Sequence, residues 1–469
     1  MSAETRGDQR SLGTPHLVFF VIAAAAPLGF SLGAIPLAIG RGGIALALGF
    51  LVTAAIMGVF SVGYVTMAAQ LTAPGGLYDF VRAGLGRAVG VGASYVALVI
   101  YAVAATGAVG SFSVFAQTAA QDLLGVHTPW WIWASGVTVV MGVLGMRSID
   151  LSARVLGVVI MLEVGVLMLV SAAIVVRGGA SGLTLAPLRP SVFLHGNVAT
   201  MLAVGIAAFA GFEATVIYSG EIRDRARTIR RATAVAIVVM AVVYAFVSWA
   251  IVVAYGADAA ASVAMSDPTA LFFNAAQKYL GTWAEALLET LVVSSLFASI
   301  LAFHNATARY LAAMGRDRFV PSWFAKATAA GAPGRASLAH TALTAAAVLL
   351  TLALGGDPYN DLYVLGSTPA VVGIPVLELL ASIAIIAYFL RDRRGHGIVA
   401  TIVAPTLAAL ALALVLAAIV DRIDLFTGRT GFVNTLSWTV IPAVLLVGVG
   451  TGLALRRGTA TADAVPQHP

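Results

Sequence analysis

Two glutamates lie inside long apolar runs, and their carboxylates are the groups in this sequence best placed to do chemistry. Glu213 follows Gly211 and Phe212 in GIAAFAGFEATVIYSG, and Glu163 lies in VVIMLEVGVLMLV. A charged group at the centre of a membrane span costs roughly 2.5–3.5 kcal/mol on insertion scales, so it needs a functional or structural reason. Such a carboxylate can carry a proton, attract a cation or cap free backbone N–H groups.

Each glutamate has more than one interpretation. Glu213 is either a titrating or gating carboxylate near a substrate, or a structural acid that caps loose backbone donors. Glu163 could carry a proton, attract Na⁺ together with Ser295 or Ser299 of a later span, pair with a basic side chain, or be a buried structural acid. We favour proton coupling, because a low-dielectric setting favours the protonated form, and we prefer Glu163 to Glu213 for that role. His304 is expected to be a packing histidine, with a proton relay as the alternative.

The composition defines the class of protein. The chain has 469 residues, of which 60% are hydrophobic and 10% charged, with a mean hydropathy of +0.96. A soluble domain has about 25% charged residues, so this is an integral membrane protein. The chain has no cysteine, which excludes disulfides and thiolate metal sites. The histidines show no metal-ligand spacing and there is no phosphate-binding loop, so we expect no enzyme activity, catalytic residue, metal, cofactor or nucleic-acid partner.

Stretches of about 20 apolar residues predict the elements that position these carboxylates. Twelve such spans lie near 16–39, 44–70, 88–121, 130–146, 151–176, 196–220, 231–255, 284–313, 336–354, 361–389, 398–420 and 435–455. With the N-terminus inside, 21 of the 27 Lys and Arg residues fall on the inner side and 6 on the outer side. This asymmetry supports the count and predicts that both termini are cytoplasmic. In the outer loop 256–283, Ser266-Asp267-Pro268 predicts the start of a short helix.

The first and sixth spans are expected to be broken. Pro27, Gly29, Gly33 and Pro36 interrupt the first span, and AAFAGFEAT interrupts the sixth. Both place a Gly-Phe-polar triplet near mid-membrane, Gly29-Phe30-Ser31 and Gly211-Phe212-Glu213. Interrupted helices at corresponding positions of two halves are typical of inverted-repeat secondary transporters. A substrate carboxylate should then meet the amides around Gly29–Gly33, and a substrate amine the carbonyls around Phe209–Gly211.

Three segments resemble the amino acid–polyamine–organocation (APC) superfamily of permeases. GFEATVIYSGEIRDRARTIRRA is similar to that family's broken sixth helix and following basic loop. FHNATARYLAAMGRDRFVPSWF resembles its cytoplasmic segment after helix eight, and PGGLYDFVRAGLG resembles its Gly-Gly-x-Tyr segment after helix two. The family's Gly-(Ser/Thr)-Gly on helix one falls on Gly29-Phe30-Ser31, where the phenylalanine would narrow the cavity.

This resemblance implies an all-α membrane protein of twelve transmembrane helices, with a five-plus-five inverted-repeat core and two extra helices. The implied divisions are a tail at 1–15, repeats at 16–177 and 190–390, the extra helices at 391–455, and a tail at 456–469. It also implies alternating access around a site between helices 1, 3, 6, 8 and 10. The expected substrate-binding residues are Pro27, Leu28, Gly29, Phe30, Ser31, Gly33, Phe209, Ala210, Gly211, Phe212 and Glu213. The expected ion-coupling residues are Glu163, Glu213, Ser295 and Ser299.

The sequence therefore predicts a secondary active permease of the cytoplasmic membrane for an amino acid or related organic amine. The coupling ion is expected to be H⁺, with Na⁺ as the alternative, and the oligomeric state is left open. A polyamine or other organocation transporter is the second hypothesis, although it would need more cavity carboxylates than Glu213 and Glu163 supply. From another class, the alternatives are a non-transporting solute sensor, which should carry a soluble output module, and a channel.

Overall fold

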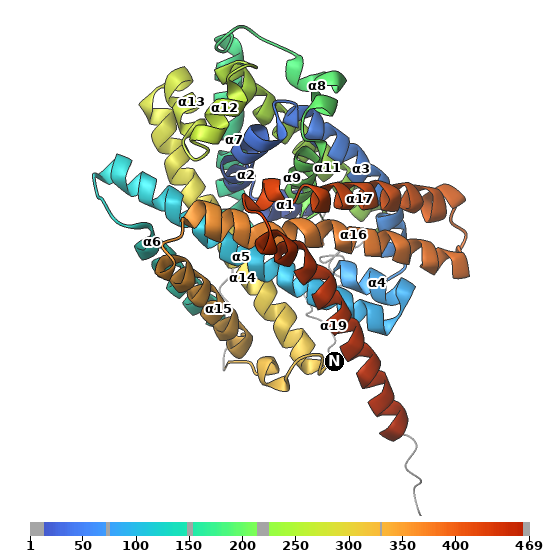
Figure 1. The fold of residues 1–469 in the computed structure, drawn as a ribbon. Helices are drawn as coiled ribbons and strands as arrows, with labels where there is room; N and C mark the ends of the chain where they lie inside the picture. The colour runs from blue at the N-terminus through green and yellow to red at the C-terminus, as the bar shows by residue number, and fades with distance from the viewer. Residues whose placement is uncertain (1–13, 72–75, 148–152, 213–224, 329–330, 463–469) are drawn as a thin grey trace, which may run out of the picture.

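The structure is a computed structural model that describes residues 14–71, 76–147, 153–212, 225–328 and 331–462 (Figure 1). Glu213, the polar residue of the triplet Gly211-Phe212-Glu213, lies outside the described residues. The described chain is helical, with no β-strand in those ranges. The prediction of an all-α membrane protein is confirmed.

The described residues of the first half of the chain form ten helical elements. They are α1 (Thr14–Ala25), α2 (Pro27–Gly42), α3 (Leu46–Ala68), α4 (Leu77–Leu85), α5 (Arg87–Leu124), α6 (Trp130–Met146), α7 (Ala153–Val176), η1 (Ala186–Leu188), α8 (Pro190–His195) and α9 (Val198–Phe209).

The second half begins with α11, and its elements again follow the apolar runs. They are α11 (Arg225–Tyr255), α12 (Ala260–Ser266), α13 (Leu271–Leu280), α14 (Thr282–Arg316), η3 (Ser322–Ala325), α15 (Gly334–Ala353), η4 (Pro358–Leu365), α16 (Gly366–Arg391), η5 (Val399–Val403), α17 (Ala404–Asp421), α18 (Asp424–Thr427) and α19 (Phe432–Ala462).

Nine helices of the described chain are long and apolar enough to cross a membrane. The remaining three predicted spans are shorter for identifiable reasons. The first is divided between α1 and α2, the sixth is described only as far as Phe212 and contains the 12-residue α9, and α6 has 17 residues. The chain is a multi-pass membrane protein, and the count of twelve and the inverted repeats stay predictions.

The break in helix one consists of a single residue. Ala26 adopts the left-handed conformation, with φ 43° and ψ 66°, between α1 and α2. Such a conformation costs a residue other than glycine about 1–2 kcal/mol. Pro27 then begins α2, a position that suits proline because its missing N–H would have no helical acceptor there. The proline thus ends one helix and starts the next.

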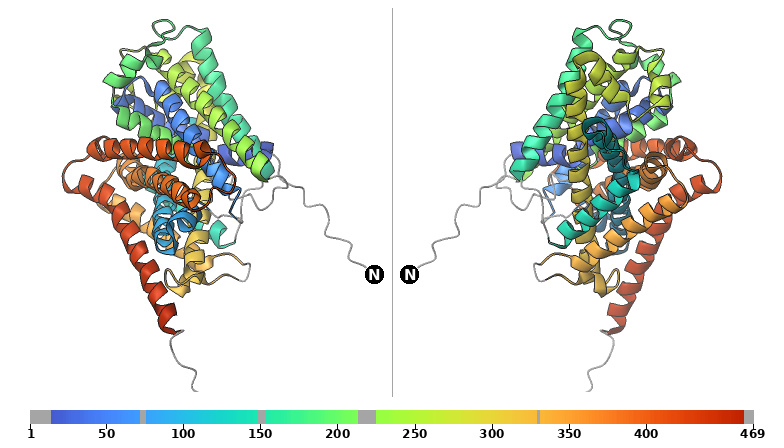
Figure 2. Two further views of the ribbon diagram at one scale, coloured as in Figure 1. Left: turned by 90° about the vertical axis from the view of Figure 1, so that its right-hand side faces the viewer. Right: turned by 90° about the vertical axis from the view of Figure 1, so that its left-hand side faces the viewer.

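Helix α5 runs through the middle of the bundle. It packs along α14, α16, α19 and α4, while α3 packs against α11, α9 and α17. Figure 1 shows α16 and α17 side by side, and α19 extends past the rest of the bundle at the end opposite α8 and α13. The same extension of α19 is seen from both sides in Figure 2.

Two connections refine the sequence analysis. The short helix predicted after Pro268 is present as α13, and the Asp267 carboxylate accepts a hydrogen bond from the Ala270 N–H at 3.1 Å. A further helix, α12, precedes it.

The arginines from Arg225 to Arg231 belong to the first turns of α11, whereas the sequence analysis placed them in a loop.

Candidate functional site

A cavity of 220 Å³ lies beside the break in helix one. Its walls come from α1 and α2, α5, α9, α14, α16 with the preceding η4, and α18. Counted as predicted spans, α1 with α2 is the first, α5 the third, α9 the sixth, α14 the eighth and α16 the tenth. These are the helices expected to surround the site, and α18 is an addition to them. A larger hollow of 350 Å³ between α1, α7 and α11 has an almost wholly apolar lining that includes the exposed Met161, so we place the candidate site in the smaller cavity.

The buried carboxylate of Glu163 lies behind the break end of the cavity, next to the lining residue Gly29. Ser295 Oγ of α14 donates to Glu163 Oε2 of α7 at 2.8 Å, and accepts from the Gly29 N–H of α2 at 3.2 Å. The Leu28 N–H also faces the Glu163 carboxylate. Glu163 and Ser295 are 2% and 1% exposed. An anionic group at a helix N-terminus complements the helix dipole, so Glu163 ties three helices together at the start of α2.

Close packing on α2 allows little extra volume near this network. A Cβ atom on Gly29 would lie 3.0 Å from the Leu296 side chain, and one on Gly33 would lie 2.8 Å from the Tyr363 hydroxyl. Tyr359 Oη also donates to the Gly33 carbonyl at 2.8 Å. Glycine at position 33 is therefore required by the approach of η4.

The break in helix six lies across the cavity. Helix α9 ends at Phe209, Ala210 lines the cavity, and Gly211 has a φ of 102°. Glycine adopts this conformation without the strain that a side chain would cause. The buried Phe212 ring then packs edge-on to Phe60 and Tyr64 of α3, at centroid distances of 5.7 and 5.3 Å. This aromatic cluster holds the chain where it leaves the break.

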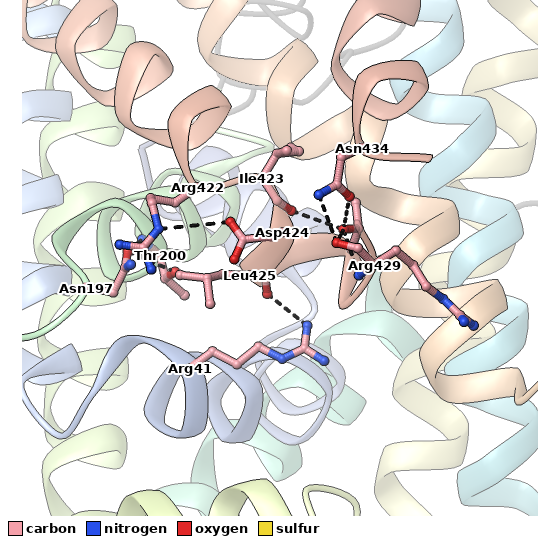
Figure 3. A network of polar contacts seen from close by, with 10 residues as sticks. Arg41, Asn197, Thr200, Arg422, Ile423, Asp424, Leu425, Arg429 and Asn434 are labelled. Carbon is pink, nitrogen blue, oxygen red and sulfur yellow. Dashed lines mark hydrogen bonds and ion pairs between the residues drawn. The ribbon is translucent and has the colours of Figure 1, made fainter. Parts of the chain in front are cut away.

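The opposite end of the cavity is covered by α18 and its flanking turns. Leu425 and Phe426 line the cavity, and Arg41 Nη1 at the end of α2 donates to the Leu425 carbonyl at 2.8 Å (Figure 3). Arg429 Nη2 lies 2.5 Å from Asp361 Oδ1 of η4. We refer to residues 422–431 as the α18 strap.

Further contacts within the strap are local. Arg422 Nε lies 3.9 Å from Asp424 Oδ1. The Thr427 hydroxyl donates to Asn434 Oδ1, and Asn434 Nδ2 donates to the Arg429 carbonyl at 2.8 Å (Figure 3). The strap is thus joined to α19 through Thr427 and Asn434, and to η4 through Arg429.

Comparisons with known proteins agree with this geometry. A family model described as amino acid permease matches residues 12–449. The chain belongs to the amino acid permease family. It is also 26% identical to proteins named uncharacterized transporters from Mycobacterium bovis and Mycobacterium tuberculosis, over 316 residues that make up 65% of this chain. The matched part spans 63% of the length of those curated relatives.

Within this permease-family fold, the expected substrate residues fall into three groups. Gly29, Phe30 and Ala210 line the cavity. Glu213 lies outside the described residues, and Gly211 adjoins Ala210 at the turn. The others are buried close to the breaks without lining the cavity: Pro27, Leu28, Ser31, Gly33, Phe209 and Phe212.

The expected ion-coupling residues are brought together in part. Glu163 and Ser295 share a hydrogen bond, and Ser299, one helical turn from Ser295, lines the cavity. The contact of a substrate carboxylate with amides at Gly29–Gly33, and the coupling roles, stay predictions.

His304 forms a buried pair with His340 instead of lining the cavity. The two Nδ1 atoms are 2.8 Å apart, His304 Nε2 is 2.8 Å from Ser337 Oγ, and His340 Nε2 is 3.3 Å from the Ala102 carbonyl. One proton arrangement satisfies all four ring nitrogens: His340 donates to Ala102, His304 donates to His340, and Ser337 donates to His304. Both rings are then neutral, and a packing role accounts for the pair.

The sequence analysis missed the α18 strap and the role of Arg41. A signal was present, because Arg422, Asp424 and Arg429 cluster between two apolar spans. Their positions alone did not show that the connection folds over the cavity, since Arg41 and Leu425 are separated by 384 residues along the chain.

Proposed function

We propose that this member of the amino acid permease family is a secondary active transporter for an amino acid or related organic amine. The substrate would occupy the 220 Å³ cavity between the two broken helices. The observation that carries the proposal is the buried Glu163 carboxylate, bound to Ser295 and to the start of α2 at one end of that cavity. A transporter needs a cavity and a titratable group that is mechanically linked to it, and this network provides the link.

The same network supports proton coupling. As a carboxylate, Glu163 forms charge-assisted hydrogen bonds, which contribute about 1.5–3 kcal/mol each. A proton on Glu163 removes the charge that complements the N-terminus of α2 and weakens its attachment to α7 and α14. Among the described residues no Lys or Arg forms an ion pair with Glu163, so a proton or a cation is the natural counter-charge. We favour H⁺, with Na⁺ as the alternative.

Alternating access would require movement at the other end. The α18 strap covers the cavity through the Arg41–Leu425 hydrogen bond and the Arg429–Asp361 ion pair. We propose that these contacts break when the cavity opens to the side on which α12 and α13 lie. The distribution of basic residues favours a cytoplasmic-membrane protein with both termini inside, which places this side outside the cell.

Uptake into proteoliposomes tests the proposal. Pools of amino acids and of amines are offered with an inward proton gradient, with a sodium gradient, and with no gradient. We expect accumulation of at least one compound, driven by the proton gradient. Absence of uptake for every pool, together with absence of ligand-induced thermal stabilisation of the purified protein, would contradict a transport function.

A further inference from the structure

We infer that the cavity selects an organic amine that lacks a carboxylate next to its amine, because the chain places a carboxylate of its own at the start of α2. This inference rests on the proposed transport function and names its substrate class. It revises the expectation that a substrate carboxylate binds the amides around Gly29–Gly33.

The backbone N–H groups of Leu28, Gly29 and Phe30, in the first turn of α2, already face acceptors of the protein itself. Pro27 has no N–H, and the Leu28 N–H faces the Glu163 carboxylate. The Gly29 N–H bonds Ser295 Oγ at 3.2 Å, and the Phe30 N–H bonds the Ala26 carbonyl at 2.9 Å. The first four N–H groups of a helix are those that bind anions. A substrate carboxylate at residues 28–30 would find no free donor.

The protein contacts that occupy these amides are held firmly. One hydroxyl, Ser295 Oγ, accepts from Gly29 and donates to Glu163 at 2.8 Å, so its orientation is fixed by two bonds. Glu163 and Ser295 are both almost fully buried. The partial positive charge of a helix N-terminus is about half an elementary charge. When Glu163 is ionised, its full charge exceeds this partial charge, and a second carboxylate would be repelled.

The rest of the break end is electronegative. Ala25, at the last turn of α1, and Ala207 and Ala210, at the end of α9, line the cavity. Both helices therefore direct their C-terminal ends, which carry partial negative charge, to this part of the cavity. These groups suit an ammonium. The rings of Phe30 and Phe303 also line the cavity, and aromatic faces attract cations.

The cationic side chain on the cavity wall is far from this end. Arg41 lies 13 residues after Leu28 on α2, which corresponds to about 20 Å along the helix axis. Its guanidinium is bonded to the Leu425 carbonyl in the strap. A small molecule with its amine at the break end does not reach Arg41. A volume of 220 Å³ also limits the substrate to a small amine.

Matched pairs of ligands test the inference on the wild-type protein. Each pair differs in a single carboxylate: histamine and histidine, 3-methylbutylamine and leucine, and 2-phenylethylamine and phenylalanine. Binding is measured by ligand-induced thermal stabilisation in detergent, and transport by counterflow in proteoliposomes, with protein-free liposomes to correct for passive entry. Counterflow needs no ion gradient, so the result does not depend on the coupling ion.

We expect the preferred amine to bind about tenfold or more tightly than its amino acid, the factor expected for one charge-assisted contact. Equal or tighter binding of the amino acids would overturn the inference while leaving transport intact. If no member of any pair, and no compound in the wider pools, binds or is exchanged, the proposed function fails and the inference fails with it.

Two variants connect the selectivity to the network. Glu163→Ala frees the Leu28 N–H and removes the negative charge, so the amine preference should fall by about tenfold. Ser295→Ala frees the Gly29 N–H and keeps Glu163, so the preference should fall by a smaller factor. Ser294→Ala is the matched control, because its hydroxyl bonds the Leu291 carbonyl of its own helix. An unchanged preference in folded Glu163→Ala and Ser295→Ala proteins would contradict the role of the network.

Discussion

The two ends of the central cavity are held by different kinds of contact. At the break end, Glu163 and Ser295 are buried and bond main-chain amides of α2. At the strap end, the side chains of Arg422, Asp424 and Arg429 are 51%, 45% and 53% exposed. Exposed ion pairs contribute about 0–1 kcal/mol, whereas loss of one partner of a buried charged contact costs about 3–5 kcal/mol. The break end is therefore suited to recognition and coupling, and the strap end to opening.

The largest expected effect is at the break end and concerns the coupling of substrate uptake to the proton gradient. Glu163→Gln keeps the size and a hydrogen-bond acceptor but cannot exchange a proton. We expect accumulation driven by a proton gradient to fall by about tenfold or more, while counterflow stays within about threefold of wild type. Uptake with and without the gradient, in the same vesicles, measures both. Accumulation that is unaltered in Glu163→Gln would exclude a coupling role for this residue.

The next effect concerns the close packing of α2 near the same end. In Gly33→Ala, the new Cβ would lie 2.8 Å from the Tyr363 hydroxyl. Overpacking of this kind costs about 1–3 kcal/mol, so the melting temperature and the uptake rate should both fall. Tyr363→Phe removes the clashing oxygen, and we expect the double variant to recover part of the stability.

Gly58→Ala is the control for this substitution, because nothing lies within 4 Å of a Cβ at that position. It should leave stability and uptake close to wild type. If Gly33→Ala were as well tolerated as Gly58→Ala, the packing of η4 against α2 would not be as close as described.

A smaller effect is expected at the strap end. Arg429→Gln removes the ion pair to Asp361, and stability should fall by less than about 1 kcal/mol. The strap should open more often, by up to about fivefold, the factor that corresponds to 1 kcal/mol. Because the chain has no cysteine, Ser299→Cys provides a single thiol on the cavity wall. Its rate of modification by a charged thiol reagent reports opening.

Arg41→Ala should also make the strap open more often and raise the rate of thiol modification, since it removes the hydrogen bond to the Leu425 carbonyl. Arg189→Gln, which changes an arginine outside the strap, serves as the control. A thiol at position 299 that reacts at the same rate in all three backgrounds would show that the strap contacts do not limit access.

The sequence predicted most of the apolar helices and the break in helix one well, because these depend on local properties. The prediction of a helix at 130–146 matches α6 residue for residue, and Pro27 marks the break in helix one. The partners of Glu163 were harder to identify. Ser295 was one of two serines proposed for it, but the hydrogen bond from Gly29 to Ser295 joins residues 266 positions apart. Periodicity and composition contain no information on such contacts.

The same limit applies to His340 and to the α18 strap. The sequence analysis weighed His304 alone, while the fold brings His340 of α15 within 2.8 Å of it. The strap lies between the predicted spans 398–420 and 435–455, and no contact was predicted for it. Its contact with η4, between Asp361 and Arg429, joins residues 68 positions apart and depends on the packing of α16, α17 and α19.

The most direct test of the contrast between the two ends is to lock one of them. Asp361→Cys and Arg429→Cys place two thiols where the ion pair now joins η4 to the strap, and a flexible bifunctional thiol reagent can connect them in this otherwise cysteine-free chain. We expect uptake of the best substrate to stop when the two are connected, to return when a reducible linker is cleaved, and to be unaffected by the reagent in either single variant. Full uptake with the strap locked would contradict the account, because the cavity would then fill and empty without opening at this end.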